Sequence, residues 1–528
     1  MRTTFDLRIK PLVGNVGLAT VLFSFILLTP LPIGAVYRED PRWLARTFVV
    51  PFATTLASGL LMWYYGRLEV DMMREREAFA AAGYLWLLLV GFGALPYVLG
   101  GTLPNGIDAY FESMSGFVTC GNTVIMDVEA VPHSILFWRS TTQWVGGLGI
   151  LVLSMVILSR ILGGSLLLFK AESPGHTITR LRPKIRDTAR LLWGIYLLYT
   201  VLGTVLLWGA GMDPFDSVNH SMTALATGGF STKNASVGHF GSPLIEGVLV
   251  ILMLLGSTNF NLHYELLRGK WRRFARDEEA RFYLAMLAFF TGVVTLDLLV
   301  NTSYGLGDSF RYSIFQVVSM NGTVGFLSTD IGPTGPVQWP GLSLFLLVVM
   351  MLIGACTGST GGGIKAVRLL ILLKAIKREL GRILHPRAVM PIRIGKSVVP
   401  ERAMASIAVF MMLYILVFFV VAAIVLGTGP DLATSMSASA SALGNVGAGI
   451  GKAAGTFTFF HPVAKIALII AMWFGRLEIY PALMLIIPTT YGESKAVDKR
   501  QMRAATPSGP VTRKRTRGRN GGPKSPRL

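Results

Sequence analysis

Charged residues are scarce in this sequence. They make up 15% of its 528 residues, whereas 52% are hydrophobic. The mean hydropathy is +0.55. A soluble protein carries about a quarter charged residues, so the composition excludes an ordinary soluble domain. Several apolar runs reach the roughly 20 residues that a helix needs to cross a bilayer. The sequence therefore predicts an all-α polytopic membrane protein.

Cysteine is nearly absent, and histidine does not cluster. The two cysteines, Cys120 and Cys356, lie far apart in glycine-rich segments, which argues against a disulfide framework. The seven histidines lack the spacing of metal ligands, and no Ser-His-Asp or paired-carboxylate arrangement stands out. We therefore predict that the chain is not an enzyme and holds no cofactor of its own.

Acidic residues are outnumbered by basic ones, 29 to 49, which gives a formal charge of +20. Most of this charge lies in three of the loops between apolar runs, at 160–190, 268–281 and 365–402. The other loops, at 101–138, 212–242, 302–341 and 428–462, hold nine Asp and Glu but only Lys233, Arg311 and Lys452 as basic residues. This is the positive-inside pattern, so the basic loops should face the cytoplasm. Most of the positive charge therefore sets the orientation of the chain in the membrane, where membrane lipid is an expected partner. No nucleic-acid partner is expected.

The apolar runs follow a repeated order. Two runs near 13–35 and 47–65 come first, and the first of them lacks a small-residue cleavage site, so we expect a retained helix. Four units then follow, each with an apolar run, a short outer helix, a glycine segment and a second apolar run. The expected divisions are an N-terminal two-helix membrane domain at 1–78, pore repeats at 79–188, 189–280, 281–402 and 403–492, and a disordered basic cytoplasmic tail at 493–528.

The four glycine segments resemble one another. They are Val118–Asn122, Ala226–Phe230, Gly322–Phe326 and Gly444–Ala448. Each follows a short amphipathic stretch that begins with an aspartate, and these aspartates, Asp108, Asp216, Asp308 and Asp431, are predicted helix N-caps. Irregular backbone at membrane depth is tolerated where it lines a watery cavity. The pattern predicts four membrane–pore–membrane repeats around a pseudo-fourfold pore.

The glycine segments have the chemistry of a cation filter. Backbone carbonyls can replace the hydration shell of a cation, and glycine permits the backbone angles that this requires. Close helix packing is the alternative for any one segment, but four copies in the same place favour the filter. The candidate ion-binding residues are Val118, Thr119, Cys120, Gly121, Ala226, Thr227, Gly228, Thr323, Val324, Gly325, Asn445, Val446 and Gly447.

A glycine-rich stretch interrupts the second apolar run of the third unit. It lacks the Gly-Lys-Ser/Thr of a phosphate-binding loop, and membrane helix surrounds it, so nucleotide binding is excluded. We interpret it as a flexible intramembrane loop beneath the filter and a candidate gate, with a plain helix kink as the alternative. Its residues are Gly354, Cys356, Thr357, Gly358, Ser359, Thr360, Gly361, Gly362 and Gly363.

Arg476 lies within the last apolar run, two residues before Glu478. An arginine within the membrane is costly and is by default a functional-site hypothesis. At the inner cavity its charge would oppose the passage of cations, as a barrier or control point. The alternative is an arginine near a helix end that extends to the membrane surface.

These motifs resemble those of the Trk-type potassium uptake proteins, membrane subunits of the Trk/Ktr/HKT superfamily of cation transporters. The resemblance covers roughly residues 10 to 490. The segments that carry it are Phe111–Phe117, Thr142–Gly149, Asn259–Tyr264, Gly358–Lys365 and Gly475–Glu478. The chain departs from the family at Cys120 and Asn122, where threonine and a small residue are commoner.

The resemblance implies several properties. Filter glycines would correspond to Gly121, Gly228, Gly325 and Gly447, the glycine-rich loop would gate, and Arg476 would line the pore. Gly121, where sodium-carrying relatives often have serine, favours K⁺ bound by carbonyls. A homodimer in the bacterial inner membrane, docked on a cytosolic nucleotide-binding ring protein, is also implied.

Alternatives remain at this level. They are a Na⁺- or H⁺-coupled symporter or sodium-permeable relative, the potassium-binding subunit of an ATP-driven pump, and a membrane-embedded enzyme or scaffold whose basic tail binds anionic lipid or RNA.

Overall fold

The structure is a computed structural model, and it describes residues 9–67, 75–161, 185–332, 335, 337–388, 390–395 and 397–477. These described residues belong to one compact unit. The predicted disordered tail at 493–528 and Glu478 lie outside the described residues. The described part is helical apart from one two-stranded hairpin, which confirms the predicted all-α class.

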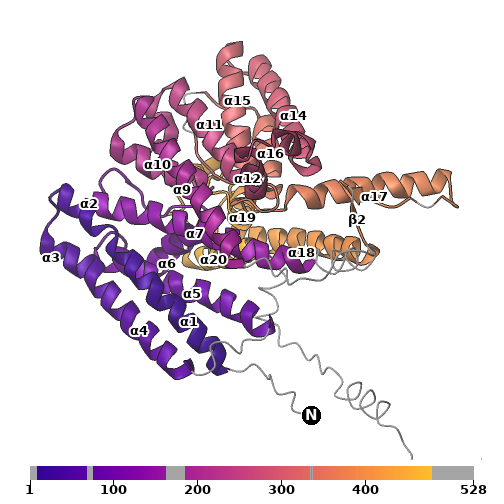
Figure 1. The fold of residues 1–528 in the computed structure, drawn as a ribbon. Helices are drawn as coiled ribbons and strands as arrows, with labels where there is room; N and C mark the ends of the chain where they lie inside the picture. Colours follow the sequence, from indigo (N-terminus) through magenta and orange to yellow (C-terminus); the bar gives the residue numbers. More distant parts are fainter. Residues whose placement is uncertain are drawn as a thin grey trace, which may run out of the picture. The chain divides into compact units, whose positions relative to one another are not determined.

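The chain begins with two long helices that pack side by side, α1 and α4 (Figure 1). Short helices join them, and Pro30 and Pro41 lie at the starts of two of these helices, where proline is well tolerated. Asp40 caps the helix that begins at Pro41 by accepting from Arg42 N–H and Trp43 N–H. The elements are α1 (Ile9–Ser24), η1 (Phe25–Leu28), α2 (Leu31–Val36), α3 (Pro41–Leu44), η2 (Ala45–Val49) and α4 (Val50–Gly66).

Four units follow, each with a largely buried helix between two apolar ones. The first holds α5 (Glu75–Leu99), α6 (Gly106–Phe117) and α7 (His133–Ile161). The second holds α9 (Ile185–Gly209), α10 (Pro214–Leu225), η4 (Ser236–Phe240), α11 (Pro243–Ser257), α12 (Phe260–Leu267) and α13 (Trp271–Arg276). The third holds α14 (Glu278–Asn301), α15 (Leu306–Asn321), α16 (Gly341–Leu352), α17 (Ala366–Leu384), β1 (Arg393–Ile394) and β2 (Ser397–Val398). The fourth holds α18 (Glu401–Leu426), α19 (Leu432–Gly444), η5 (Gly451–Ala453) and α20 (Pro462–Leu477).

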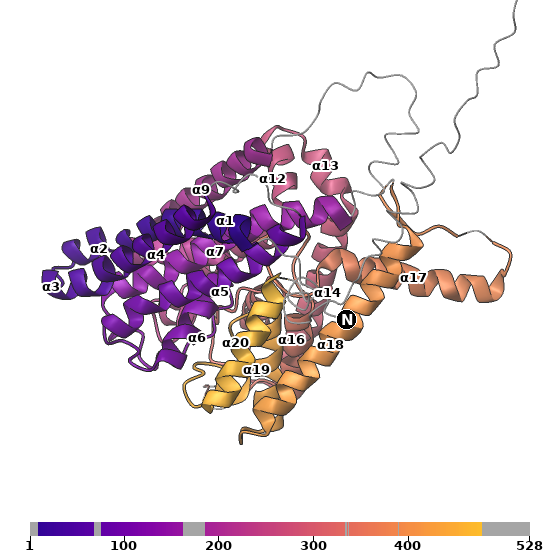
Figure 2. The ribbon, with the colours of Figure 1, turned by 90° about the horizontal axis from the view of Figure 1, so that it is seen from below.

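Two predicted apolar runs are broken. The run at 243–267 turns by 108° between α11 and α12, where Asn259 caps the second helix by accepting from Asn261 N–H at 2.9 Å. The run at 341–375 breaks between α16 and α17, at the glycine-rich loop. Figures 1 and 2 show α17 extending away from the helices around it. The hairpin β1–β2 follows α17 in the chain.

Five helical stretches of the described part are long and apolar enough to cross a membrane, and the bent pair α11–α12 would make a sixth. The five are Ile9–Val36, Pro41–Gly66, Arg190–Gly209, Glu278–Asn301 and Glu401–Leu426. This agrees with the predicted polytopic membrane protein.

The short helices α6, α10, α15 and α19 lie in the interior, and most of their residues are buried although many are polar. Eight of the thirteen residues of helix α19 are alanine or serine, whose small side chains let neighbouring backbones approach. We call these four the pore helices.

The predicted caps of the pore helices are wrong in three cases of four. Asp431 is an N-cap and accepts from Thr434 N–H at 3.0 Å. The others begin earlier than predicted, with Asn105, Asp213 and Gly305 at the cap. Asp108, Asp216 and Asp308 lie in the first turn instead, where a carboxylate still complements the helix dipole.

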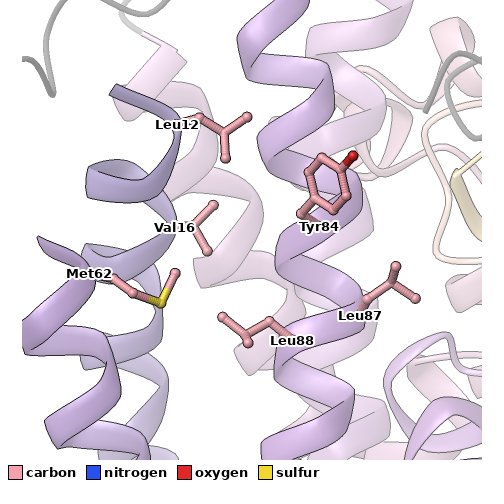
Figure 3. A pocket seen from close by; sticks show the side chains of 6 residues that line it. All are labelled: Leu12, Val16, Met62, Tyr84, Leu87 and Leu88. Atoms are coloured by element: carbon pink, nitrogen blue, oxygen red, sulfur yellow. The ribbon is translucent and has the colours of Figure 1, made fainter. Parts of the chain in front are cut away.

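An apolar groove of about 370 Å³ lies among α1, α4 and α5 (Figure 3). Its walls are Leu12, Val16, Met62, Tyr84, Leu87 and Leu88. Beside it, α1 and α4 touch through glycines. A Cβ at Gly17 would overlap the backbone of α4 at Gly59 and Trp63.

We predict that Gly17→Ala lowers the melting temperature by several degrees, because separating α1 from α4 costs about 1–3 kcal/mol, as overpacking does elsewhere. Gly194→Ala in α9 is the matched control, since a Cβ there meets no described atom within 4 Å. It should leave the melting temperature unchanged or raise it. Thermal unfolding of the purified protein decides this, and equal behaviour of the two variants would contradict the close packing.

Candidate functional site

The four glycine segments share one backbone conformation. One or two residues after the end of each pore helix, the backbone is left-handed. The φ angle is 50° at Thr119, 55° at Thr227, 55° at Thr323 and 54° at Asn445. Two residues later each segment has a glycine with positive φ, and these are Gly121 (93°), Gly229 (73°), Gly325 (83°) and Gly447 (103°). Threonine is β-branched and rarely left-handed, so each costs about 1–3 kcal/mol, and such strain clusters at functional sites.

Hydrogen bonds repeat in the same way. The N–H between the two special positions donates to a carbonyl five residues earlier in the pore helix, at 2.8–2.9 Å. The donor and acceptor pairs are Cys120 with Ser115, Gly228 with Thr223, Val324 with Ser319 and Val446 with Ser441. Each pore helix therefore ends in the same turn, which directs the following backbone in the same way four times.

This geometry moves the second segment by one residue. Gly229, rather than Gly228, is the counterpart of Gly121, Gly325 and Gly447, and Gly228 takes the place of Cys120. The predicted alignment on Gly228 is therefore wrong. Either of two adjacent glycines could adopt the positive φ, but the flanking residues carry a signal for this register. Thr227, Gly229 and Phe230 match Thr323, Gly325 and Phe326 position by position.

The four positive-φ glycines form a closed ring. A Cβ at Gly121 would overlap the carbonyl oxygen of Gly228, and one at Gly229 would overlap that of Val324. A Cβ at Gly325 would overlap the oxygen of Val446, and one at Gly447 that of Cys120, which returns to the first segment. Each glycine thus lies against the carbonyl of the next segment in chain order. The four segments meet around one axis, in pseudo-fourfold arrangement.

A cavity of about 190 Å³ opens on one side of this ring, and all four glycines line it. Thr123, Ser231, Asn234 and Thr456 add polar groups to its wall. These residues belong to the loops that hold few basic residues, so the cavity faces outward by the charge pattern.

Acidic residues near this outer side are mostly engaged. Asp108 pairs with Lys465 at 2.7 Å, and Asp216 pairs with Lys233 at 3.2 Å. Asp127 is exposed, and the Asn234 amide, which donates to its Oδ1 at 2.8 Å, lowers the pKa of Asp127. Asp127 therefore remains ionised at neutral pH beside the cavity.

A buried ion pair supports the first two segments from behind. Arg139 Nε lies 2.9 Å from Glu112 Oε1, and the two side chains are 2% and 0% exposed. Glu112 also accepts from Val124 N–H at 2.9 Å, and Arg139 donates to the Ser231 carbonyl at 3.0 Å. The Glu112–Arg139 pair therefore holds the backbone just after Gly121, at Val124, and just after Gly229, at Ser231.

Gln143, one turn further along α7, holds the second segment. Its Nε2 donates to the Gly228 carbonyl at 2.7 Å, and its Oε1 accepts from Phe230 N–H at 3.0 Å. A Cβ at Gly228 would overlap this amide, which is the structural reason for the first glycine of the pair.

The glycine-rich loop at 353–365 lies against the other side of the ring. Gly362 N–H donates to Thr323 Oγ1 at 2.8 Å, and a Cβ at Gly362 would overlap the carbonyl of Gly444. Thr360 Oγ1 lies 2.9 Å from the carbonyl oxygens of both Leu225 and Gly256, and either one can accept its single proton. Pore-helix ends of the second, third and fourth units therefore touch the loop. Most of its residues are buried: Gly354, Cys356, Ser359, Thr360, Gly361 and Gly362 are, whereas Thr357, Gly358 and Gly363 are half-buried.

Glu279, in the first turn of α14, binds this loop through hydrogen bonds. Its Oε1 accepts from Thr357 N–H at 2.6 Å, Thr357 Oγ1 at 2.9 Å and Val367 N–H at 3.2 Å. The neighbouring Glu278 binds Lys374 of α17 and accepts from Gly395 N–H at 2.9 Å. One short stretch therefore contacts both the loop and the hairpin beyond α17.

Arg476 is 3% exposed, which excludes the alternative of an arginine extending to the membrane surface. Its Nη1 donates to the Thr360 carbonyl of the loop at 2.7 Å, and its Nη2 donates to the Gly146 carbonyl of α7 at 3.2 Å. The guanidinium thus joins the fourth unit, the loop and the first unit beneath the ring.

Arg139, Gln143 and Glu279 were not among the predicted site residues. Arg139 had a usable signal, because it lies inside the predicted apolar run at 135–160 and an intramembrane charge is a functional-site hypothesis. Gln143 and Glu279 act through backbone groups far away in the sequence, and no local pattern predicts such contacts.

Comparisons with known proteins give consistent matches. The model of the TrkH family, described as cation transport protein, matches residues 46–491. The chain is 39% identical over 483 residues to the Trk system potassium uptake protein TrkH of Escherichia coli, covering 90% of this chain and 98% of that protein. It is 36% identical over 485 residues to the protein of the same name from Halomonas elongata, covering 91% and 99%.

A solved structure matches as well. The crystal structure of the potassium transporter TrkH from Vibrio parahaemolyticus superposes with a TM-score of 0.83 at 36% sequence identity, covering 92% of this chain and 100% of that chain.

We predict that Arg139→Met lowers the free energy of unfolding by about 3–5 kcal/mol, because Glu112 is left buried without its partner. Adding Glu112→Gln should restore part of the loss. Lys270→Met is the control: Lys270 pairs with Glu265 but is 44% exposed, so its loss should change stability by less than about 1 kcal/mol. Thermal unfolding in detergent measures all three, and an Arg139→Met protein as stable as Lys270→Met would contradict a supporting role for the pair.

Proposed function

The chain belongs to the TrkH family of cation transport proteins, and on that premise we propose that it takes up K⁺ across the membrane through the ring of four glycine segments. The single observation that carries the proposal is the closed contact of each ring glycine with the carbonyl of the next segment. Oxygens held in such a ring can replace the hydration shell of K⁺. The relatives are named as potassium uptake proteins, which supports K⁺ as the transported ion.

The selectivity filter in this proposal comprises residues 118–121, 226–229, 322–325 and 444–447. Four pore helices end at the ring, so their partly negative C-termini lie next to it and favour a cation. K⁺ is then cargo bound by backbone carbonyls, and no cofactor of the chain takes part.

The gate in this proposal is the loop at 353–365 together with Arg476. Arg476 places a positive charge beneath the ring and ties the loop to α7 through two carbonyls. Glu279 holds the loop from the cytoplasmic end of α14. In this arrangement the loop obstructs the path, and conduction requires that these bonds be exchanged for others.

A cytosolic partner would act on the gate from α17. Helix α17 carries exposed Leu373, Ile376, Leu380, Ile383 and Leu384, an apolar surface suited to protein contact. We propose that this region meets a nucleotide-binding ring protein and a second copy of the chain in the bacterial inner membrane. The relatives' description as parts of a Trk system supports a partner.

We predict that Gly121→Ser lowers K⁺ selectivity over Na⁺, because its Cβ displaces the Gly228 carbonyl from the ring. Reversal potentials of the purified protein in liposomes measure the permeability ratio. Gly247→Ser in α11 is the control, since a Cβ there meets no described atom within 4 Å. A ratio unchanged by Gly121→Ser would remove Gly121 from the filter.

We also predict that Arg476→Ala raises basal K⁺ flux severalfold, because the barrier charge and two bonds to the loop region are lost. Arg476→Lys keeps the positive charge, but an ammonium lacks the planar guanidinium that donates to both carbonyls. The flux of Arg476→Lys should therefore lie between that of the wild type and that of Arg476→Ala. Isotope or fluorescence flux into liposomes measures both. Reduced or unaltered flux in Arg476→Ala would refute the barrier.

A further inference from the structure

The residue after each ring glycine differs among the four segments. Phe230, Phe326 and Ala448 occupy this position in three segments, and Asn122 occupies it in the first. The Asn122 side chain is fully buried. A buried amide is costly unless it is hydrogen-bonded, so its contacts are informative.

Asn122 belongs to a hydrogen-bond chain that crosses from the first unit to the fourth. Gly447 N–H donates to Ser441 Oγ at 3.0 Å, and Ser441 Oγ donates to Asn122 Oδ1 at 2.9 Å. A hydroxyl has one proton. Ser441 donates that proton to Asn122, and its oxygen accepts from Gly447 N–H. Cys120 Sγ adds a weaker contact to the Ser441 carbonyl at 3.6 Å.

The equivalent hydroxyls in two other pore helices are used differently. Ser319 Oγ donates to the Phe326 carbonyl of its own segment at 2.7 Å, and Thr223 Oγ1 donates to Asn219 of its own helix at 3.0 Å. Ser441 instead reaches the next unit around the ring. This is the junction where the ring closes, because Gly447 lies against the carbonyl of Cys120.

We propose that Asn122 and Ser441 are positioning residues that set the K⁺/Na⁺ selectivity of this chain by fixing the junction between its first and fourth segments. The inference rests on the proposed function. Neither side chain touches the ion; they act through Gly447 N–H and the Cys120 carbonyl. If the junction loosens, these carbonyls can close on a smaller ion, and Na⁺ is then less well excluded.

The test uses the full-length protein in liposomes, with permeability ratios from reversal potentials. Asn122→Ala and Ser441→Ala should each lower the K⁺/Na⁺ ratio about fivefold, the factor that corresponds to one ordinary hydrogen bond. The double variant should be no worse than either single one, because both break the same chain. Ser441→Thr retains the hydroxyl and should keep most of the selectivity, and it remains informative if an alanine variant fails to fold.

Ser439→Ala is the matched control. Ser439 is a buried serine of the same helix, but it donates to the Phe418 carbonyl at 2.8 Å, away from the ring. Its removal should leave the ratio unchanged. Unchanged ratios in folded Asn122→Ala and Ser441→Ala, or an equal loss in Ser439→Ala, would overturn the inference. A wild-type protein that carries no K⁺ would instead overturn the proposed function, so the two failures are distinct.

Discussion

The structure around the ring of four glycine segments depends on the contact between a glycine without a side chain and the backbone carbonyl of the next segment. At Gly121, Gly229, Gly325 and Gly447 a single additional carbon would push that carbonyl away. The left-handed turn before each glycine, with threonine or asparagine in it, is the strained conformation that brings the backbone there. Surrounding groups hold this strain in place: Glu112 with Arg139 behind the first two segments, and Gln143 behind the second.

The loop beneath the ring is held by side-chain and backbone hydrogen bonds. Arg476, Glu279, Thr360 and Thr323 supply side-chain bonds. The backbone adds Cys356 N–H to the Ser257 carbonyl and Phe260 N–H to the Gly358 carbonyl, both at 3.0 Å. A typical net contribution is about 1 kcal/mol for each. Moving a gate from mostly closed to mostly open requires roughly 5.5 kcal/mol of differential binding by a ligand or partner. In the gate that we propose, a cytosolic partner would act through bonds of this kind, because Glu279 contacts the loop and the neighbouring Glu278 contacts the region beyond α17.

Much of this arrangement could be predicted from the sequence because it is repeated. Four copies of a helix and a glycine turn between apolar runs predicted the all-α class and the repeats, and the resemblance of the motifs predicted the family. The family match and the solved structure confirm them. The register at Gly228 and Gly229 was predicted wrongly because the alignment used the glycine alone, whereas the threonine before the pair and the phenylalanine after it match Thr323 and Phe326 of the third segment. The N-caps were placed on Asp108, Asp216 and Asp308 because an aspartate near a helix start fits both the cap and the first turn. The 108° bend after α11 falls at Ser257, Thr258 and Asn259, three polar residues inside the stretch predicted as one apolar run at 243–267, so a polar interruption marked the bend and was not used.

The central claim is that four carbonyl-bearing segments form one K⁺-selective path. The most direct measurement is the reversal potential of the purified wild-type protein in liposomes, with K⁺ on one side, Na⁺ on the other and no proton gradient. The account predicts a potential close to the K⁺ equilibrium value. A potential near zero, or one that follows an imposed proton gradient instead, would contradict it.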